Sequence, residues 1–165
     1  MSRRYEVLDH TADIGLRAYG KTLEEAFLNM ALGMISLIVP EKGCVLSREE
    51  RHVEAGAASL ESLLVAWLSE FVYLIYAERF LPAEIELPHV AREGASDDGP
   101  VRWTISGAVR GERVDPARHA MEMEIKGVSY HLLRIGRVGE VEGESEGEDR
   151  PEPGGAWVAQ AIFDV

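Results

Sequence analysis

The sequence predicts an α+β fold in which two helices pack on one face of a mostly antiparallel sheet. In the first half of the chain, apolar residues recur at helical spacing in two segments. In the second half they alternate with other residues, which is typical of strands. The length of 165 residues and the apolar fraction of 46% predict one domain, residues 1–165, with its own hydrophobic core.

Two short strands and a helix are expected first. Tyr5–Leu8 and Ile14–Tyr19 have the pattern of strands. The hydroxyl of Thr22 can cap a helix, and Glu25 three residues later completes a capping box. Apolar residues at helical spacing then continue up to Pro40, which ends the helix.

A second helix follows the polar, weakly strand-like segment Cys44–Gly56. Ser59 is its expected N-cap, and Pro82 lies just past its end. The apolar face is wide, which predicts a deeply buried helix, and it consists of Leu60, Leu63, Leu64, Trp67, Phe71, Leu74 and Ile75.

The second half of the chain contains the remaining predicted strands. Apolar residues alternate with other residues at Ile85–Leu87, Val101–Ile105 and Met121–Ile125. Two further strand candidates are Tyr130–Ile135 and Trp157–Phe163.

Two segments between these strands are expected to be loops. Gly94–Pro100 is a cluster of turn residues. The segment 139–155 is predicted to be a flexible acidic loop, with seven acidic residues against one arginine. It is either a solvated spacer or a contact for a basic partner.

The charge and composition narrow the classes of function. A net charge of −12 disfavours autonomous binding of nucleic acid and favours docking on a basic protein or holding a cation. No run approaches the roughly 18 apolar residues that cross a membrane, so we expect a cytoplasmic protein without a membrane partner. The single cysteine, Cys44, can form neither an internal disulfide nor a cysteine-based zinc site.

Two places in the sequence could bring carboxylates together. The turn His10–Gly15 could point Asp13 outward, although Thr11 and Asp13 could equally bond neighbouring backbone N–H groups. Asp164 and Val165 offer a side-chain and a main-chain carboxylate, unless this end is frayed and solvated. If Asp13 lies beside them, the three carboxylates form a hard oxygen site suited to Ca²⁺, Mg²⁺ or Mn²⁺.

A third candidate is the segment Glu124–His131. Lys126 faces outward if the alternation holds, and Ser129 and His131 share a face, although an ordinary solvent face has the same pattern. No phosphate-binding glycine loop, nucleophile elbow or paired-histidine zinc motif is present. No role is assigned to three other histidines, His52, His89 and His119.

Several blocks in this chain resemble the archease family. They are Tyr5–Leu16, Gly20–Phe27, Ala31–Met34, Glu124–His131 and Phe163–Val165, in the family's order and over nearly the whole chain. The departures are a longer acidic loop, and Gly127 and Ser129 where alanine and threonine are expected.

The resemblance implies a compact α+β domain with a three-carboxylate metal site. Its ligands would be Asp13, Asp164 and the terminal carboxylate of Val165, with His10 and Lys126 as supporting residues nearby. The implied cofactor is a divalent metal, with Ca²⁺ expected in crystals and Mg²⁺ or Mn²⁺ as alternatives.

The implied partner is the GTP-dependent tRNA-splicing RNA ligase, which joins 3′-phosphate to 5′-hydroxyl RNA ends through a guanylylated histidine. An archease would promote guanylylation and multiple turnover without being an enzyme and without contacting nucleic acid directly. Two alternatives remain. One is a chaperone or specificity factor for other RNA-modifying enzymes, such as a tRNA methyltransferase. The other is a metal-dependent phosphoesterase with His10 as acid or base.

Overall fold

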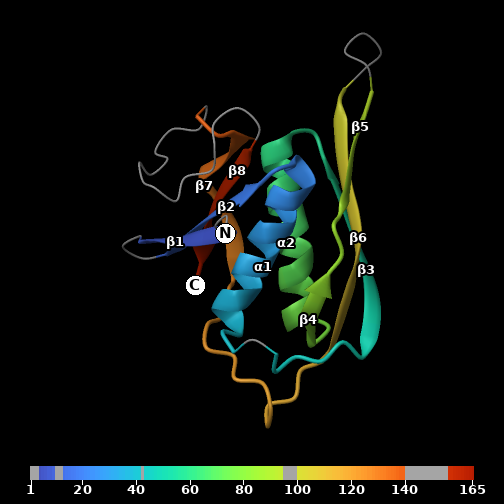
Figure 1. Ribbon diagram of the computed structural model, residues 1–165, viewed down its shortest axis with the longest axis vertical. Helices are drawn as coiled ribbons and strands as arrows, with labels where there is room; N and C mark the ends of the chain where they lie inside the picture. The colour runs from blue at the N-terminus through green and yellow to red at the C-terminus, as the bar shows by residue number, and fades with distance from the viewer. Residues whose placement is uncertain (1–3, 10–12, 42, 95–99, 140–155) are drawn as a thin grey trace.

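The computed structural model describes residues 4–9, 13–41, 43–94, 100–139 and 156–165 (Figure 1). His10, most of the turn cluster Gly94–Pro100 and nearly all of the acidic segment 139–155 lie outside these ranges. The predictions made for them therefore stay predictions.

The described residues form two helices and eight strands. In chain order the elements are β1 (Tyr5–Asp9), β2 (Ile14–Gly20), α1 (Leu23–Ile38), β3 (Glu49–Ala57), α2 (Leu60–Tyr76), β4 (Phe80–Ile85), β5 (His89–Glu93), β6 (Arg102–Arg113), β7 (Gly127–Arg137) and β8 (Trp157–Asp164).

The strands form two antiparallel sheets. The first sheet has the order β1–β2–β8–β7, and the second has the order β3–β6–β4 with β5 also paired to β6. The α+β class, the two helices and the antiparallel pairing are thereby confirmed, whereas the division into two sheets was not foreseen. Figure 1 shows both helices between the sheets, with α1 packed mainly on β2 and β8 and α2 contacting both β3 and β7.

The wide apolar face of α2 explains this arrangement. A helix that is apolar over much of its circumference needs neighbours on more than one side. The side chain of Trp67 is fully buried and packs edge to face on Phe71, with 4.8 Å between ring centroids. Its indole Nε1–H donates to the Phe27 carbonyl of α1 at 3.2 Å, so the largest core side chain also joins the two helices.

Both predicted helix caps are present. The Thr22 hydroxyl accepts from the Glu25 N–H at 3.1 Å, and the Ser59 hydroxyl accepts from the Ser62 N–H at 3.1 Å. Each bond satisfies one of the backbone donors that the first turn of a helix leaves unpaired.

The predicted strand at Met121–Ile125 is absent from the described sheets. Its alternation is real, because Ile125 is buried and its neighbours are exposed, but its backbone bonds the ends of the helices. The Glu122 N–H donates to the Ile38 carbonyl at 2.9 Å, which gives a partner to one of the last carbonyls of α1. The Tyr76 hydroxyl accepts from the Ile125 N–H at 2.9 Å and donates to the Met123 carbonyl at 3.4 Å.

None of the helices in the described ranges is long and apolar enough to cross a membrane.

Candidate carboxylate site

The first sheet brings Asp13 and Asp164 to the same end of two neighbouring strands. β2 and β8 are antiparallel, and Ile14 is paired with Phe163. The residue before Ile14 and the residue after Phe163 therefore lie opposite each other, and these are Asp13 and Asp164. Asp164 is exposed and Asp13 is partly buried.

Asp164 lies on the face of the sheet that is turned away from the helices. Ala161 and Phe163 of β8 belong to the main core, so the alternating residues Gln160, Ile162 and Asp164 face outward. Continued by one residue, the alternation of β2 assigns Asp13 to this outer face as well.

Strand β7 holds Asp164 from the other side. The Lys126 N–H donates to the Asp164 carbonyl at 2.8 Å, and Gly127 is paired with Asp164. A Cβ placed on Gly127 would lie 3.7 Å from Asp164 Oδ2, an ordinary van der Waals contact. The backbone of Lys126 therefore lies at this end of the sheet, and its supporting role stays a prediction. Gly127, which the sequence analysis noted only as a departure from the family pattern, is a neighbour of the carboxylate.

The structure says less about the other two predicted site residues, Val165 and His10. Val165 follows Asp164 directly and is 42% exposed. His10 lies outside the described residues, so its position relative to Asp13 stays a prediction. Throughout the described ranges, no cluster of three or more His, Cys, Asp and Glu side chains is arranged for a metal ion. A cation here would thus need ligands beyond the two aspartate side chains.

The outer face of the first sheet also contains a buried chain of polar groups that the sequence analysis did not predict. Arg17 and Gln160 are only 4% and 7% exposed. Arg17 Nε and Nη2 donate to Gln160 Oε1 at 3.1 and 2.6 Å, and Nη1 donates to Glu6 Oε1 at 3.3 Å. The Tyr19 hydroxyl also donates to Glu6 Oε1, at 3.2 Å, and burial raises the pKa of this hydroxyl. One available signal was that Gln160 is the single polar residue between Trp157 and Phe163.

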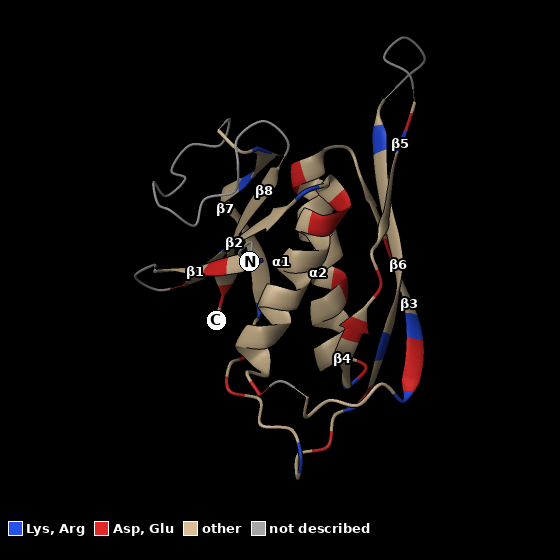
Figure 2. Ribbon diagram, in the orientation of Figure 1, with Lys and Arg blue, Asp and Glu red and all other residues tan. Residues whose placement is uncertain are grey.

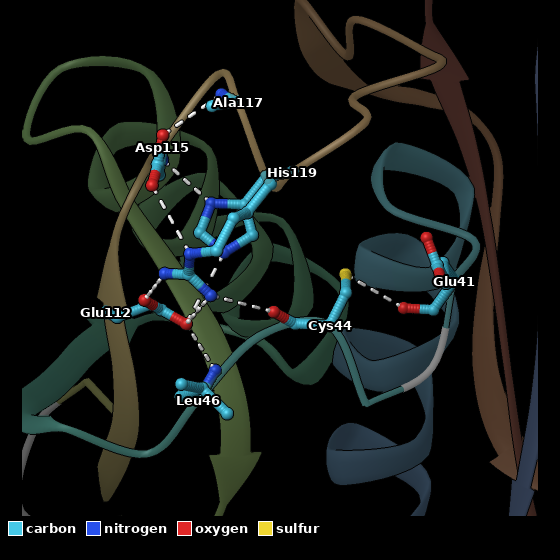
Figure 3. A network of polar contacts seen from close by, with 8 residues as sticks. Glu41, Cys44, Leu46, Glu112, Asp115, Ala117 and His119 are labelled. Atoms are coloured by element: carbon cyan, nitrogen blue, oxygen red, sulfur yellow. Dashed lines mark hydrogen bonds and ion pairs between the residues drawn. The ribbon is translucent and has the colours of Figure 1, made fainter.

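A second polar network lies where the connections after α1 and β6 meet (Figure 3). Glu112, 4% exposed, accepts from the Leu46 N–H and from the Arg118 guanidinium. Arg118 also donates to the Cys44 carbonyl at 3.5 Å and to Asp115 at 3.3 Å. These bonds tie the connection 39–48 to the connection 114–126.

His119 completes this network, although no sequence pattern singled it out. Its Nδ1 accepts from the Asp115 N–H at 2.8 Å, which places the proton of the neutral ring on Nε2. Nε2 lies 3.4 Å from Glu112 Oε2, outside hydrogen-bond geometry, and has no other partner. Hydrogen bonding to Arg118 is the main reason why the pKa of Glu112 falls to about 2, and Glu112 in turn raises the pKa of Arg118. The network stabilises the fold and lies apart from the carboxylates of the first sheet.

Comparison with known proteins connects this architecture to one family. The model of the Archease protein family matches residues 5–165. Protein archease of Methanosarcina mazei is 33% identical over 163 residues, covering 99% of this chain and 97% of that protein. Protein archease of Pyrococcus furiosus is 32% identical, with 99% of each chain covered. The solution structure of Methanobacterium thermoautotrophicum protein 1598 superposes with a TM-score of 0.68 at 26% identity, covering 98% of this chain and 99% of that one. The chain belongs to the archease family.

Proposed function

We propose that this archease binds a divalent cation through Asp13, Asp164 and the main-chain carboxylate of Val165, and that it thereby assists a GTP-dependent tRNA-splicing RNA ligase. In this role it is an accessory protein, which promotes guanylylation and repeated turnover of the ligase and catalyses no reaction itself.

The observation that carries the proposal is the register of β2 and β8. It pairs Ile14 with Phe163, so Asp13 and Asp164 are the next residues along the two adjacent strands, although 151 positions separate them in the sequence. Two neighbouring carboxylates repel each other, and a cation relieves that repulsion. A donor set made only of oxygens fits Mg²⁺, Mn²⁺ or Ca²⁺ better than Zn²⁺ or Cu²⁺.

The surroundings of Asp164 support the same interpretation. Its backbone carbonyl accepts from the Lys126 N–H, and the preceding residue, Phe163, is paired with Ile14 of β2 on the other side. Gly127 leaves the space next to Asp164 Oδ2 free of a side chain. A site on strands is fixed more precisely than one on a loop. A bound divalent cation supplies positive charge that compensates phosphate during guanylyl transfer.

The charge distribution favours a protein partner over RNA. The chain has a net charge of −12, and binding to nucleic acid rests on many Lys and Arg contacts to phosphate. Figure 2 shows the Lys and Arg of the described chain dispersed among Asp and Glu rather than gathered on one face. A basic protein surface near the ligase's phosphate-handling site is the complementary partner.

The decisive variant is Asp13→Ala. We expect it to lose Mn²⁺ binding in calorimetry and to lose stimulation of ligase guanylylation, while its circular dichroism spectrum stays that of the wild type. Glu54→Ala is the matched control, because Glu54 is 78% exposed on the second sheet. It removes a carboxylate far from the proposed ligands and should leave both readouts unchanged.

Full ligase stimulation by Asp13→Ala would refute the proposal. A variant with extra residues after Val165 gives a second arm, since it displaces the proposed main-chain ligand. Release of phosphate from model esters by the purified protein with Mn²⁺ would instead indicate a phosphoesterase.

A further inference from the structure

Strand β7 has an unusually large bulge close to the two aspartates. Ser129 is paired with Ile162 and Arg134 with Gln160, so the four residues Tyr130–Leu133 stand opposite the single residue Ala161 of β8. An ordinary bulge inserts one extra residue. Three extra residues make the chain project from the edge of the first sheet.

The backbone of this bulge is strained at Leu132. Its φ angle is 56°, in the left-handed region that side chains other than glycine rarely adopt. Such a conformation persists only where the surrounding structure fixes it, and residues of this kind gather at functional sites.

Gln160 is the residue that fixes it. Its Nε2 donates to the Leu132 carbonyl at 3.0 Å, and its Oε1 accepts from Arg17. Because a guanidinium can only donate, the carboxamide oxygen must face Arg17 and the carboxamide nitrogen must face the bulge. Arg17 is in turn held by the partly buried Glu6, so a chain of side chains from β1, β2 and β8 ends at the bulge of β7.

The bulge exposes apolar side chains that an isolated protein would gain by burying. Tyr130 is 63% exposed and Leu132 is 38% exposed, whereas Leu133 is 5% exposed and anchors the bulge in the core. Tyr130 follows Gly127 by three residues, which span about 10 Å of extended chain, and Gly127 is paired with Asp164. An apolar projection thus lies on the strand next to Asp164, a few residues along from the glycine that is paired with it.

We propose that Tyr130 and Leu132 are the apolar contact through which this archease docks on its protein partner, and that Gln160 is the positioning residue that holds them in shape. The inference rests on the proposed function. The surface that fits them is an apolar pocket bordered by Lys or Arg, because Asp13 and Asp164 lie alongside and the whole chain is acidic. Tyrosine side chains that enter such pockets commonly carry much of the binding free energy of an interface.

Gln160→Glu tests the positioning role. Glutamate has the same shape and still accepts from Arg17, but it has no N–H to donate to the Leu132 carbonyl. We expect faster amide hydrogen exchange at residues 130–133, and a dissociation constant for the purified RNA ligase that rises on the order of tenfold. Mn²⁺ binding and the maximal stimulation at saturating concentration should stay at wild-type values, which a merely structural defect would not produce.

Leu132→Asn tests the contact itself. Asparagine tolerates the left-handed conformation, so the bulge keeps its shape and loses only its apolar side chain. The Leu132→Asn variant should bind the ligase as weakly as Gln160→Glu does, but its amide hydrogen exchange at residues 130–133 should stay at the wild-type rate. Leu87→Asn is the matched control, since Leu87 is 61% exposed on the connection between β4 and β5, and its affinity should equal that of the wild type.

The outcomes separate the two proposals. Wild-type affinity of Leu132→Asn for the ligase overturns the docking surface, and unchanged exchange in Gln160→Glu overturns the positioning role. Loss of self-association in Leu132→Asn, measured by sedimentation with ligase binding intact, would mean that a second copy covers the bulge and also overturns the inference. If Asp13→Ala stimulates the ligase like the wild type while the bulge variants bind it more weakly, only the metal mechanism is refuted. If the wild-type protein neither binds nor stimulates the ligase, both proposals are refuted.

Discussion

At the scale of single residues, Glu112 is a buried charge that joins two connections of the fold. It joins the Leu46 N–H of one long connection to the Arg118 guanidinium of another, and it is almost fully buried. The bonds from Arg118 and Leu46 stabilise the carboxylate form and outweigh the cost of burial, so the pKa falls from 4.5 to about 2.

A depressed carboxyl pKa makes stability depend on pH. The contribution of Glu112 is present in full above pH 4.5, and it is lost as the pH falls from 4.5 through about 2. Glu112→Gln should therefore be less stable than the wild type at pH 7, and the difference in free energy of unfolding should shrink over that interval. Urea unfolding at several pH values measures it.

Glu86→Gln is the control for this prediction. Glu86 pairs with Arg110 at the exposed surface, where side chains are 50% and 60% exposed, so its loss should change little at any pH. A difference between Glu112→Gln and the wild type that stays constant from pH 7 to pH 2 would contradict the prediction.

The helix caps, whose partners are close in sequence, could be predicted, whereas the residues that bond distant partners could not. Thr22 and Ser59 cap donors three positions away, so their roles are visible in the local sequence. Gln160 bonds Leu132 and Arg17, which are 28 and 143 positions away. Only the strand register brings these groups together, and no local pattern encodes it.

At the scale of elements, the segment Met121–Ile125 shows what alternation does and does not report. Alternation records which side chains are buried, and there the prediction was right for Ile125. It does not record the partner of the backbone, which here is the end of a helix and the Tyr76 hydroxyl. Burial raises the pKa of Tyr76, so this hydroxyl stays protonated and can both accept and donate.

The pairing of β4 with β6 depends on a glycine. The register shifts between Pro82 and Glu84, and a Cβ on Gly111 of β6 would lie 1.9 Å from the Leu81 carbonyl oxygen. We expect Gly111→Ala to lower the free energy of unfolding by about 1–3 kcal/mol, because backbone atoms must move apart.

Gly107→Ala in the same strand is the matched comparison. The nearest atom to a Cβ there is Pro88 Cα at 3.5 Å, an ordinary contact, so this change should be nearly neutral in urea unfolding. If both variants lose the same free energy of unfolding, the loss comes from alanine anywhere in this strand and not from the close contact of Gly111 with Leu81.

At the scale of the whole molecule, the acidic charge should govern how fast a partner is found. A chain with a net charge of −12 approaches a basic surface faster at low salt, because the Debye length falls from about 30 Å at 0.01 M to about 8 Å at 0.15 M. We expect the association rate with the ligase to fall over this interval while the dissociation rate changes less, as stopped-flow mixing can measure.

Replacing Glu140, Glu142, Glu144 and Glu146 by glutamine distinguishes the two interpretations of the acidic segment. A contact with the partner predicts that this variant loses more of the salt dependence than its smaller net charge accounts for, whereas a solvated spacer predicts a loss in proportion to the net charge. An association rate that is independent of salt in the wild type would contradict the electrostatic model altogether.

Much of the architecture could be predicted, because the hydrophobic periodicity of α1, α2, β2 and β8 is strong. The separation into two sheets could not, since the pairing of strands depends on contacts distant in sequence. The proposed ligands were named from the family resemblance, and the register of β2 and β8 pairs Ile14 with Phe163, the neighbours of two of them.

The order of strands in the first sheet has a consequence for synthesis. Of the strands in the described residues, β8 is synthesised after the other seven, yet it occupies an interior place between β2 and β7. Until it inserts, β2 and β7 have unpaired edges, and Arg17 has no Gln160 to bond. A nascent chain that stalls before β8 would expose strand edges that can pair with other chains. It would also lack Asp164 and the Gln160 bond to the bulge, so the proposed site can form only after β8 has joined the sheet.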